Sequence, residues 1–353
     1  NMYRFTVEEA RKNGMQIDMN NGTGWPFGGP KTSIQDAACK LIITEYQVKG
    51  GDFVRQRIEV TDAKQKPYAQ LERLMAFSDK GKCLNLTSMV HDGELSWNAP
   101  KGNWKLIAAF CGKTLQKVKR AAPGGEGYVL NHFSKQAVYN YLHRFDEAFD
   151  QAKAEAPHNF FNDSYEVYGA DWTTNFFDEF ERFRGYKLEE HLPEFLSKER
   201  TETTARIISD YRETLADLLL ENFTKQWTEW AHAHSSATRN QAHGSPGNLI
   251  DLYATVDIPE CEGFGLSDFG IKGLRKDSLT RPNFSDLSML KYASSAAHLT
   301  GKLYTSSETF TWLTEHFRTS LSQCKPDIDL MFVSGVNHTF FHGTTYSPAE
   351  AAW

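Results

Sequence analysis

The sequence predicts an α/β fold in which strands and helices alternate and close as a (β/α)8 barrel of the TIM type, with an inserted all-β subdomain. Two observations predict the barrel. After residue 130, helical patterns alternate with short strands, which is typical of a parallel sheet with right-handed crossovers. Polar side chains also follow nearly every predicted strand. A doubly wound sheet fits the alternation as well, but functional side chains at so many strand ends favour the closed barrel.

The first third of the chain contains three kinds of sequence pattern. Residues 4–13 form an amphipathic helix pattern, and residues 14–30 read as a strand that runs into a Gly-rich loop. From 40 to 112 short alternating or apolar runs are separated by turn residues, which predicts a β-rich insertion. We therefore expect the start of a partial barrel at 1–39, the inserted subdomain at 40–112 and the remainder of the barrel at 113–353.

The last two thirds carry the repeated strand–helix units. Helices are predicted at 134–155, 174–198, 203–233, 248–254, 286–299 and 312–324. The helix at 203–233 has the clearest pattern, because its apolar residues recur at three- and four-residue steps. Between the helices lie the predicted strands, which are HNFFND (158–163), TRNQAH (238–243), DIPECE (257–262), KLYTSSE (302–308) and GVNHTFFHG (335–343).

Composition limits the function classes. A chain of 353 residues that is 40% hydrophobic is long enough to bury one large core or two smaller ones. A net charge of −6 with scattered Lys and Arg offers no surface for nucleic acid. No run reaches the roughly 18 apolar residues of a membrane span. The five cysteines form no CxxC pair and are expected to be free thiols. Both ends read as the interior of a longer sequence, so we expect a fragment.

Two glutamates stand where a buried strand opens into a loop. They are Glu166, in FFNDSYEVYG, and Glu308, in KLYTSSETFTW. Carboxylates at the ends of strands n and n+3 of such a barrel project into one mouth, as a glycosidase requires. Each glutamate also has a structural explanation, a capping box from Asp163 to Glu166 and helix-dipole chemistry at Glu308. Further polar residues at the strand ends weaken that explanation, namely Asn162, Asp163, Asn240, Gln241, His243, Glu260, Glu262, Asn337 and His338.

Other site chemistries lack their motifs. The Gly clusters match neither GxGxxG nor a GK[ST] ending, and GxSxG is absent. His338 and His342 would point the same way on a strand, as sugar contacts or, less favoured, as metal ligands.

Several long motifs resemble one known family. FNDSYEVYGADWT, RNQAHGSPGNLIDLYATVDIPECEGFG, SSETFTW and GVNHTFFHGTTYSP are similar to glycoside hydrolase family 106, the α-L-rhamnosidases of plant-pectin degradation. The resemblance extends from about residue 5 to the end of the chain. It implies that GMQIDMN is the third barrel strand, FFNDSYE the fourth, KLYTSSE the seventh and GVNHTFFHG the eighth, so that strands one and two are missing from this sequence. It also implies further β-sandwich domains in the full-length chain and a periplasmic or secreted bacterial protein.

The same resemblance implies an inverting hydrolysis of terminal α-L-rhamnosyl residues, with a calcium ion near the sugar. Glu166 becomes the general acid and Glu308 the general base. Tyr165, Tyr168 and Trp172, helped by Asp163, would raise the pKa of Glu166. Candidate calcium ligands are Asp163, Glu260 and Glu262. The expected sugar-binding residues are Asn162, Asp163, Trp172, Asn240, His243, Glu262, Trp312, His338 and His342, with Trp25, Trp172 and Trp312 as candidate stacking platforms.

Two alternatives remain open at this point. A retaining β-glycosidase would use Glu308 as a nucleophile, with carboxyl groups about 5–5.5 Å apart instead of about 6.5–9.5 Å. A catalytically dead carbohydrate-binding barrel would bind sugar without hydrolysis, although the presence of both glutamates speaks against it.

Overall fold

The computed structural model describes residues 2–276, 278, 280–282, 286–311 and 319–343. The chain divides into two compact units. Unit 1 comprises Asn1–Pro26, Asp146–Glu166 and Trp227–Trp353, and unit 2 comprises Phe27–Phe145 and Val167–Gln226.

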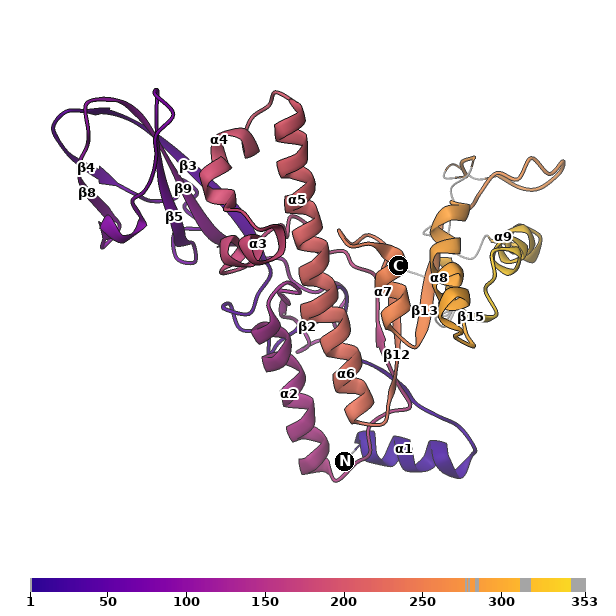
Figure 1. Ribbon diagram of the computed structural model, residues 1–353. Helices are drawn as coiled ribbons and strands as arrows, with labels where there is room; N and C mark the ends of the chain where they lie inside the picture. Colours follow the sequence, from indigo (N-terminus) through magenta and orange to yellow (C-terminus); the bar gives the residue numbers. More distant parts are fainter. Residues whose placement is uncertain (1, 277, 279, 283–285, 312–318, 344–353) are drawn as a thin grey trace. The chain divides into compact units, whose positions relative to one another are not determined.

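Unit 1 is built on a parallel sheet of six strands that neighbour one another in chain order. Its strands are β1 (Asp18–Asn20), β11 (Asn159–Asn162), β12 (Ala237–Gln241), β13 (Ile258–Phe264), β14 (Ser306–Thr311) and β15 (His338–Phe341). Figure 1 labels β12, β13 and β15 of this sheet. Every neighbouring pair is parallel, as the strand–helix alternation predicts. Within the described residues β1 and β15 do not pair, so a complete barrel is not confirmed and the sheet is a half-barrel.

The curl of this sheet is visible in the surroundings of Arg239. In a flat sheet β12 and β15 would lie about 14 Å apart, because strands are spaced by about 4.8 Å. The Arg239 guanidinium on β12 nevertheless lies 4.1 Å from the ring centre of Phe161 on β11 and 3.8 Å from that of Phe340 on β15. The inner face of the sheet is therefore strongly concave.

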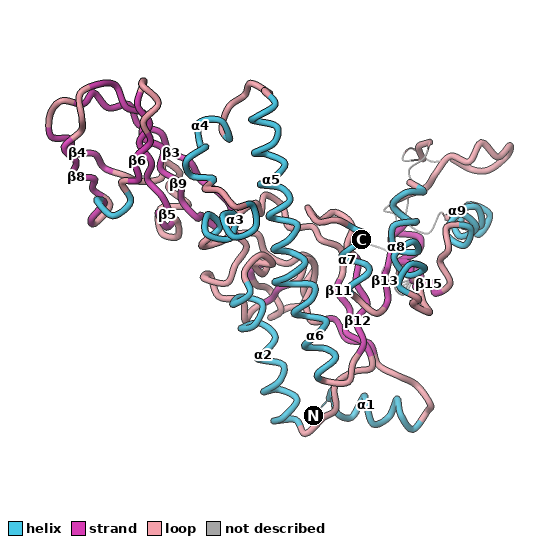
Figure 2. The backbone as a smooth tube through the Cα atoms, viewed as in Figure 1, coloured by secondary structure: helices cyan, strands magenta, loops and turns pink. Residues whose placement is uncertain are grey.

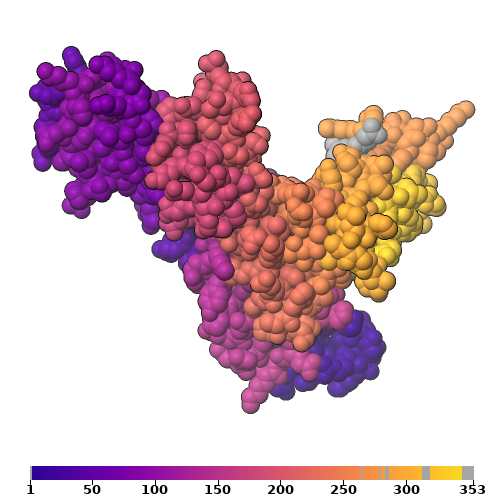
Figure 3. Space-filling view, viewed as in Figure 1, coloured from indigo at the N-terminus to yellow at the C-terminus, as the bar shows by residue number. Residues whose placement is uncertain are grey.

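Helices alternate with the strands of unit 1. They are α1 (Met2–Lys12), α6 (Gln226–Ala233), α7 (Leu249–Thr255), α8 (Leu287–Thr300) and α9 (Leu321–Val333). Ser307 of β14 donates a hydrogen bond to the Met331 sulfur of α9 at 3.4 Å, which places α9 against the outer face of the sheet. Leu299 of α8 and Val333 of α9 have exposed apolar side chains. The segment that holds these two helices is coloured orange to yellow in Figure 3.

The helix predicted at 312–324 is wrong in its bounds. Residues 312–318 lie outside the described residues, and the described helix α9 runs from Leu321 to Val333. Ser320 and Gln323 form a capping box, which fixes the start of the helix at this point.

The helix predicted at 203–233 consists of three consecutive segments. α5 (Glu202–Leu218) is capped by Thr201, whose side chain accepts a hydrogen bond from the Thr204 backbone N–H. A π-helical segment, η3 (Leu219–Lys225), follows, and α6 completes the run. The predicted apolar stripe is buried at Ile207, Leu215, Leu218, Leu219, Phe223 and Trp227.

Unit 2 contains the β-rich segment. One antiparallel sheet has the order β3 (Cys39–Gly50), β9 (Gly102–Lys113), β5 (Gln70–Ser78) and β6 (Cys83–Asn85). A second has the order β4 (Phe53–Arg57), β8 (Glu94–Asn98) and β7 (Val90–His91). Their core includes Trp97 and Trp104, packed edge to face with ring centres 5.2 Å apart. Unit 2 includes more of the chain than the segment 40–112, because it also contains residues on both sides of that segment.

The remaining elements are short, apart from α2 (Lys135–Ala152), and are coloured by type in Figure 2. β2 (Gly28–Gly29) pairs with β10 (Tyr128–Val129). The helical segments are η1 (Thr87–Met89), α3 (Phe176–Arg184), η2 (Leu188–His191) and α4 (Leu192–Phe195). No helix among the described residues is both long and apolar enough to cross a membrane.

Candidate active site

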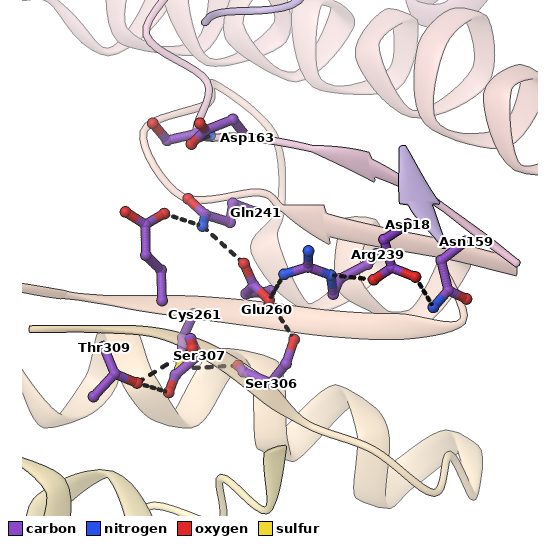
Figure 4. A network of polar contacts seen from close by, with 12 residues as sticks. Asp18, Asn159, Asp163, Arg239, Gln241, Glu260, Cys261, Ser306, Ser307 and Thr309 are labelled. Atoms are coloured by element: carbon purple, nitrogen blue, oxygen red, sulfur yellow. Dashed lines mark hydrogen bonds and ion pairs between the residues drawn. The ribbon is translucent and has the colours of Figure 1, made fainter. Parts of the chain in front are cut away.

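The strand register of unit 1 gathers carboxylates at the carboxyl edge of the sheet. Glu260 of β13 is level with Gln241 of β12, and Glu262 is level with Glu308 of β14. Residues two apart on a strand share a face. Glu260 and Glu262 therefore lie on the same face, beside Glu308. The contacts of Arg239, Gln241, Glu260 and Ser306 on this face are drawn in Figure 4.

Glu308 has a hydrogen-bond donor at each carboxylate oxygen. Oε2 accepts from Gln241 Nε2 at 2.7 Å, and Oε1 accepts from Thr311 Oγ1 at 2.9 Å. His342 Nε2 lies 3.8 Å from Oε1. The side chain keeps 17% of its surface exposed. Glu308 is thus held in a defined direction while part of it stays accessible.

Glu260 is the most buried carboxylate, with 1% of its side chain exposed. Its Oε2 accepts from Arg239 at 2.5 Å and from Ser306 Oγ at 2.6 Å, and its Oε1 accepts from Gln241 at 2.9 Å. A buried charge is tolerated when it is paired and hydrogen-bonded, and Arg239 supplies that pair. Glu260 therefore belongs to the framework beneath the site.

Glu262 is paired with the histidine that follows β12. Its Oε2 lies 2.7 Å from His243 Nε2, and both side chains are buried. Burial is the main cause that raises the pKa of Glu262, and the charges of Glu308 and Glu166 add to it, while the His243 contact opposes it.

The loop after β11 carries Asp163 and Glu166. Asp163 Oδ1 accepts from the Ser164 backbone at 2.7 Å, and Ser164 Oγ donates to Glu166 Oε1 at 3.3 Å. Burial raises the pKa of Asp163 to about 7, and the charges of Glu308, Glu262 and Glu260 add to this shift. The site thus holds a carboxyl group that is poised to carry a proton near neutral pH.

The loop after β12 comes close to this segment at Gly244. Gly244 has φ +79°, and a Cβ atom there would lie 2.7 Å from the Tyr165 carbonyl oxygen. Only glycine permits both this backbone conformation and this approach. The glycine therefore keeps the loops that carry His243 and Glu166 in contact.

The two structural explanations of the glutamates are wrong. No helix begins after Asp163 as the capping box requires, because the next helix in the chain starts at Phe176, in α3. Glu308 lies within β14, between Ser306 and Thr311, and not at the first turn of a helix.

Asn162 and Asn240 lie apart from the carboxylates. Asn162 Nδ2 donates to Asn240 Oδ1 at 2.7 Å, and both residues are buried. Strand alternation turns Asn240 away from the face of Arg239 and Gln241. The amides of these two asparagines therefore pair with each other, and their role as sugar contacts stays a prediction.

The prediction that Trp172 binds sugar is wrong. It belongs to unit 2, where its side chain is 0% exposed and its indole donates to Glu72 at 3.0 Å. A fully buried ring offers no surface for a sugar. Trp25 is half-buried in unit 1, and Trp312 lies outside the described residues.

The two predicted histidines of β15 lie at opposite ends of the strand. His342 follows the strand and lies beside Glu308. His338 begins the strand, level with Ser306, and its ring lies 5.4 Å from that of Tyr304. Asn337 bonds the backbone of Thr305 and Leu303 before the strand. His338 and Asn337 therefore lie toward the amino edge, away from the row of Glu308.

The candidate calcium ligands do not form a metal cradle. Both oxygens of Glu260 are bonded within the protein, and Glu262 is paired with His243. Within the ranges that the structure describes, no group of three or more His, Cys, Asp or Glu side chains is arranged to hold a metal ion. Calcium stays a prediction, and we derive no step through it.

Sequence reasoning did not single out Arg239, Ser306 or Thr311. Arg239 had a detectable signal, since a charged residue in a buried parallel strand must be paired. Ser306 and Thr311 are ordinary strand residues, and only the structure shows that they bond carboxylates.

Comparisons with known proteins identify the family and the fold. Residues 64–352 match the family model of glycoside hydrolase family 106, described as alpha-L-rhamnosidase. A protein of Formosa agariphila named "Putative beta-glucuronidase" is 26% identical over 398 aligned residues, covering 99% of this chain and 32% of that protein. The solved rhamnosidase of Novosphingobium sp. PP1Y has the same fold, with a TM-score of 0.81 at 18% identity, covering 98% of this chain and 50% of that one.

The chain belongs to glycoside hydrolase family 106, because the family model covers well over half of it. It spans about a third of the curated relative's length.

Proposed function

We propose that the protein containing this chain is an α-L-rhamnosidase that removes terminal rhamnosyl residues from plant pectic poly- or oligosaccharides. The observation that carries this proposal is the cluster of carboxylates at the carboxyl edge of a family 106 half-barrel, in which Glu308 is oriented by Gln241 and Thr311. Two carboxyl groups that flank a glycosidic bond are the machinery of most glycoside hydrolases.

In this proposal Glu308 is the general base and Glu166 the general acid of an inverting reaction. A base must present a carboxylate whose direction is fixed, and the two donors on Glu308 support this role. Glu166 lies on a loop at the same edge, close enough to Glu262 for its charge to raise that residue's pKa. Protonation of the leaving oxygen by Glu166 would accompany attack by a water molecule that Glu308 deprotonates.

Asp163 supports the acid. Its pKa of about 7 lets it hold a proton at neutral pH, three residues before Glu166. As the pH rises through 7 Asp163 becomes charged, and its negative charge favours the protonated form of Glu166, which is the form that a general acid needs.

A substrate panel tests the proposal on the full-length protein. Aryl α-L-rhamnoside and aryl β-D-glucuronide are compared, because a relative is named as a β-glucuronidase. Hydrolysis of the rhamnoside, with the inverted anomer formed first in an NMR time course, is expected. Turnover of the glucuronide alone would reject the rhamnosidase assignment, a retained anomer would reject the inverting mechanism, and sugar binding without turnover of either compound would indicate a binding barrel.

A further inference from the structure

The amide of Gln241 joins two carboxylates from neighbouring strands. Its nitrogen donates to Glu260 at 2.9 Å and to Glu308 at 2.7 Å. An amide nitrogen carries two hydrogens, so each carboxylate receives one of them. The reverse orientation would turn the amide oxygen toward two acceptors, which is repulsive. The direction of Gln241 is therefore fixed by its partners.

This arrangement leaves the other end of the amide unsatisfied. The Gln241 oxygen is buried and has no hydrogen-bond partner among the residues that the structure describes. An unpaired buried acceptor is unfavourable. The local structure thus forgoes one hydrogen bond while both amide hydrogens remain on the carboxylates.

One of the two carboxylates is an anchor. Glu260 is held by Arg239 and Ser306 in addition to Gln241. Arg239 lies between two aromatic rings, and its Nε is 3.7 Å from Asp18, which accepts from Asn159 at 2.8 Å. Figure 4 shows these residues as a continuous line of polar contacts that reaches Gln241.

The other carboxylate is the accessible one. Glu308 keeps 17% of its side chain exposed, against 1% for Glu260. Of the two side chains, Glu308 therefore has room to move and Glu260 does not. Gln241 transfers the fixed position of Glu260 to Glu308.

We propose that Gln241 is a positioning residue for Glu308, anchored through Glu260 and Arg239, and that it sets the direction in which Glu308 meets the attacking water. This inference rests on the proposed role of Glu308 as the base. Gln241 itself transfers no proton.

The test is a double-mutant cycle in the full-length protein, with Gln241→Met and Glu308→Gln. Methionine keeps the length of the side chain and removes both donors. In the native background kcat is expected to fall about 100-fold, as for a displaced catalytic group, with KM changed by less than about threefold. In the Glu308→Gln background, turnover is supported by azide on an activated aryl rhamnoside. There Gln241→Met is expected to change the azide-supported rate by less than about threefold, because no base remains to be positioned.

Ser307→Ala is the matched control. Ser307 precedes Glu308 on β14, is fully buried and faces the opposite side of the sheet, where it contacts Thr309. Its loss should leave kcat unchanged in both backgrounds. Should Gln241→Met fail to fold, Gln241→Glu carries the same test, since it keeps the shape and donates at most one hydrogen.

The outcomes separate the two proposals. An equal loss of rate in both backgrounds would show that Gln241 merely supports the structure, and would overturn the inference. Native kcat in Gln241→Met, with Glu308→Gln inactive in water, would overturn the inference and leave the proposed function intact. Undiminished hydrolysis by Glu308→Gln would overturn the role of Glu308 and the positioning role with it.

Discussion

Glu262 and Glu308 lie directly opposite each other on the adjacent parallel strands β13 and β14. Their side chains nevertheless have different partners, an imidazole for Glu262 and an amide with a hydroxyl for Glu308. The pKa of Glu262 is raised by burial and by the charges of Glu308 and Glu166. Two carboxyl groups in unlike surroundings are suited to different roles.

Replacement of Glu308 by Gln should abolish hydrolysis of substrates with good and poor leaving groups alike, because the water loses its proton acceptor. The measurement is steady-state turnover on a series of aryl rhamnosides, with sugar binding followed separately by calorimetry. Glu9→Gln, at an exposed position in α1, serves as the control and should leave turnover unchanged. Added azide should yield a glycosyl azide of inverted configuration, and a product of retained configuration would make Glu308 a poor candidate for the base.

Replacement of Glu166 by Gln should impair poor leaving groups most, because acid assistance contributes about 10²–10⁴-fold and activated aryl groups need little of it. Turnover plotted against leaving-group pKa should become steeper in the variant. A uniform loss across the series would show that Glu166 is not the acid. In that case Asp163, whose pKa is about 7, would be the next candidate to test.

Asp163 should make stability depend on pH. Its pKa is raised to about 7 from the usual value of about 3.9, so the fold prefers its protonated form. The stability that this preference contributes is fully present below about pH 4 and is lost as pH rises through 7. Asp163→Asn should therefore lose less stability than the native protein between pH 4 and pH 8, as measured by urea unfolding.

The matched control is Asp329→Asn, at a half-exposed carboxylate on α9 that pairs with Lys325. The unfolding free energy of the Asp329→Asn variant should change with pH as that of the native protein does. If Asp163→Asn also follows the native curve, the carboxyl group of Asp163 is not held protonated by the fold.

Alanine at Gly244 should destabilise unit 1 by about 2–4 kcal/mol, because the new Cβ adds a clash with the Tyr165 carbonyl to the strain of a positive φ. Gly301→Ala has a similar φ of +67° with no atom within 4 Å of the Cβ, and should cost only about 1 kcal/mol. Chemical unfolding measures the loss of unfolding free energy in both variants, and the difference between the two losses is the cost of the clash with the Tyr165 carbonyl. Equal losses in the two would mean that the loops carrying His243 and Glu166 are free to separate.

The sequence predicted the parallel strands well because their signals are local. Apolar runs such as FFND and polar strand ends such as DIPECE placed β11 and β13 within a few residues. The helix after β14 was misplaced, because a capping box at Ser320 decides its start and the apolar pattern there is weak.

For the site, residue types were predictable and their pairings were not. The carboxylates at 166, 260, 262 and 308 stand out at strand ends, but only register shows that Gln241 bridges Glu260 and Glu308. Trp172 was misread because an aromatic residue near a glutamate in sequence need not share its surroundings. The fold buries this indole in unit 2, where Glu72 satisfies its N–H.

The contact of Arg239 with Phe340 links β12 to β15, two strands that do not pair with each other. A displacement of β15 would press on the guanidinium, and through it on Glu260 and Gln241, without passing along the ladder of β13 and β14. The half-barrel is therefore stabilised by a side-chain contact across its concave face as well as by the backbone hydrogen bonds of its strands. A movement of β15 is expected to alter the position of Glu308, on which hydrolysis is proposed to depend.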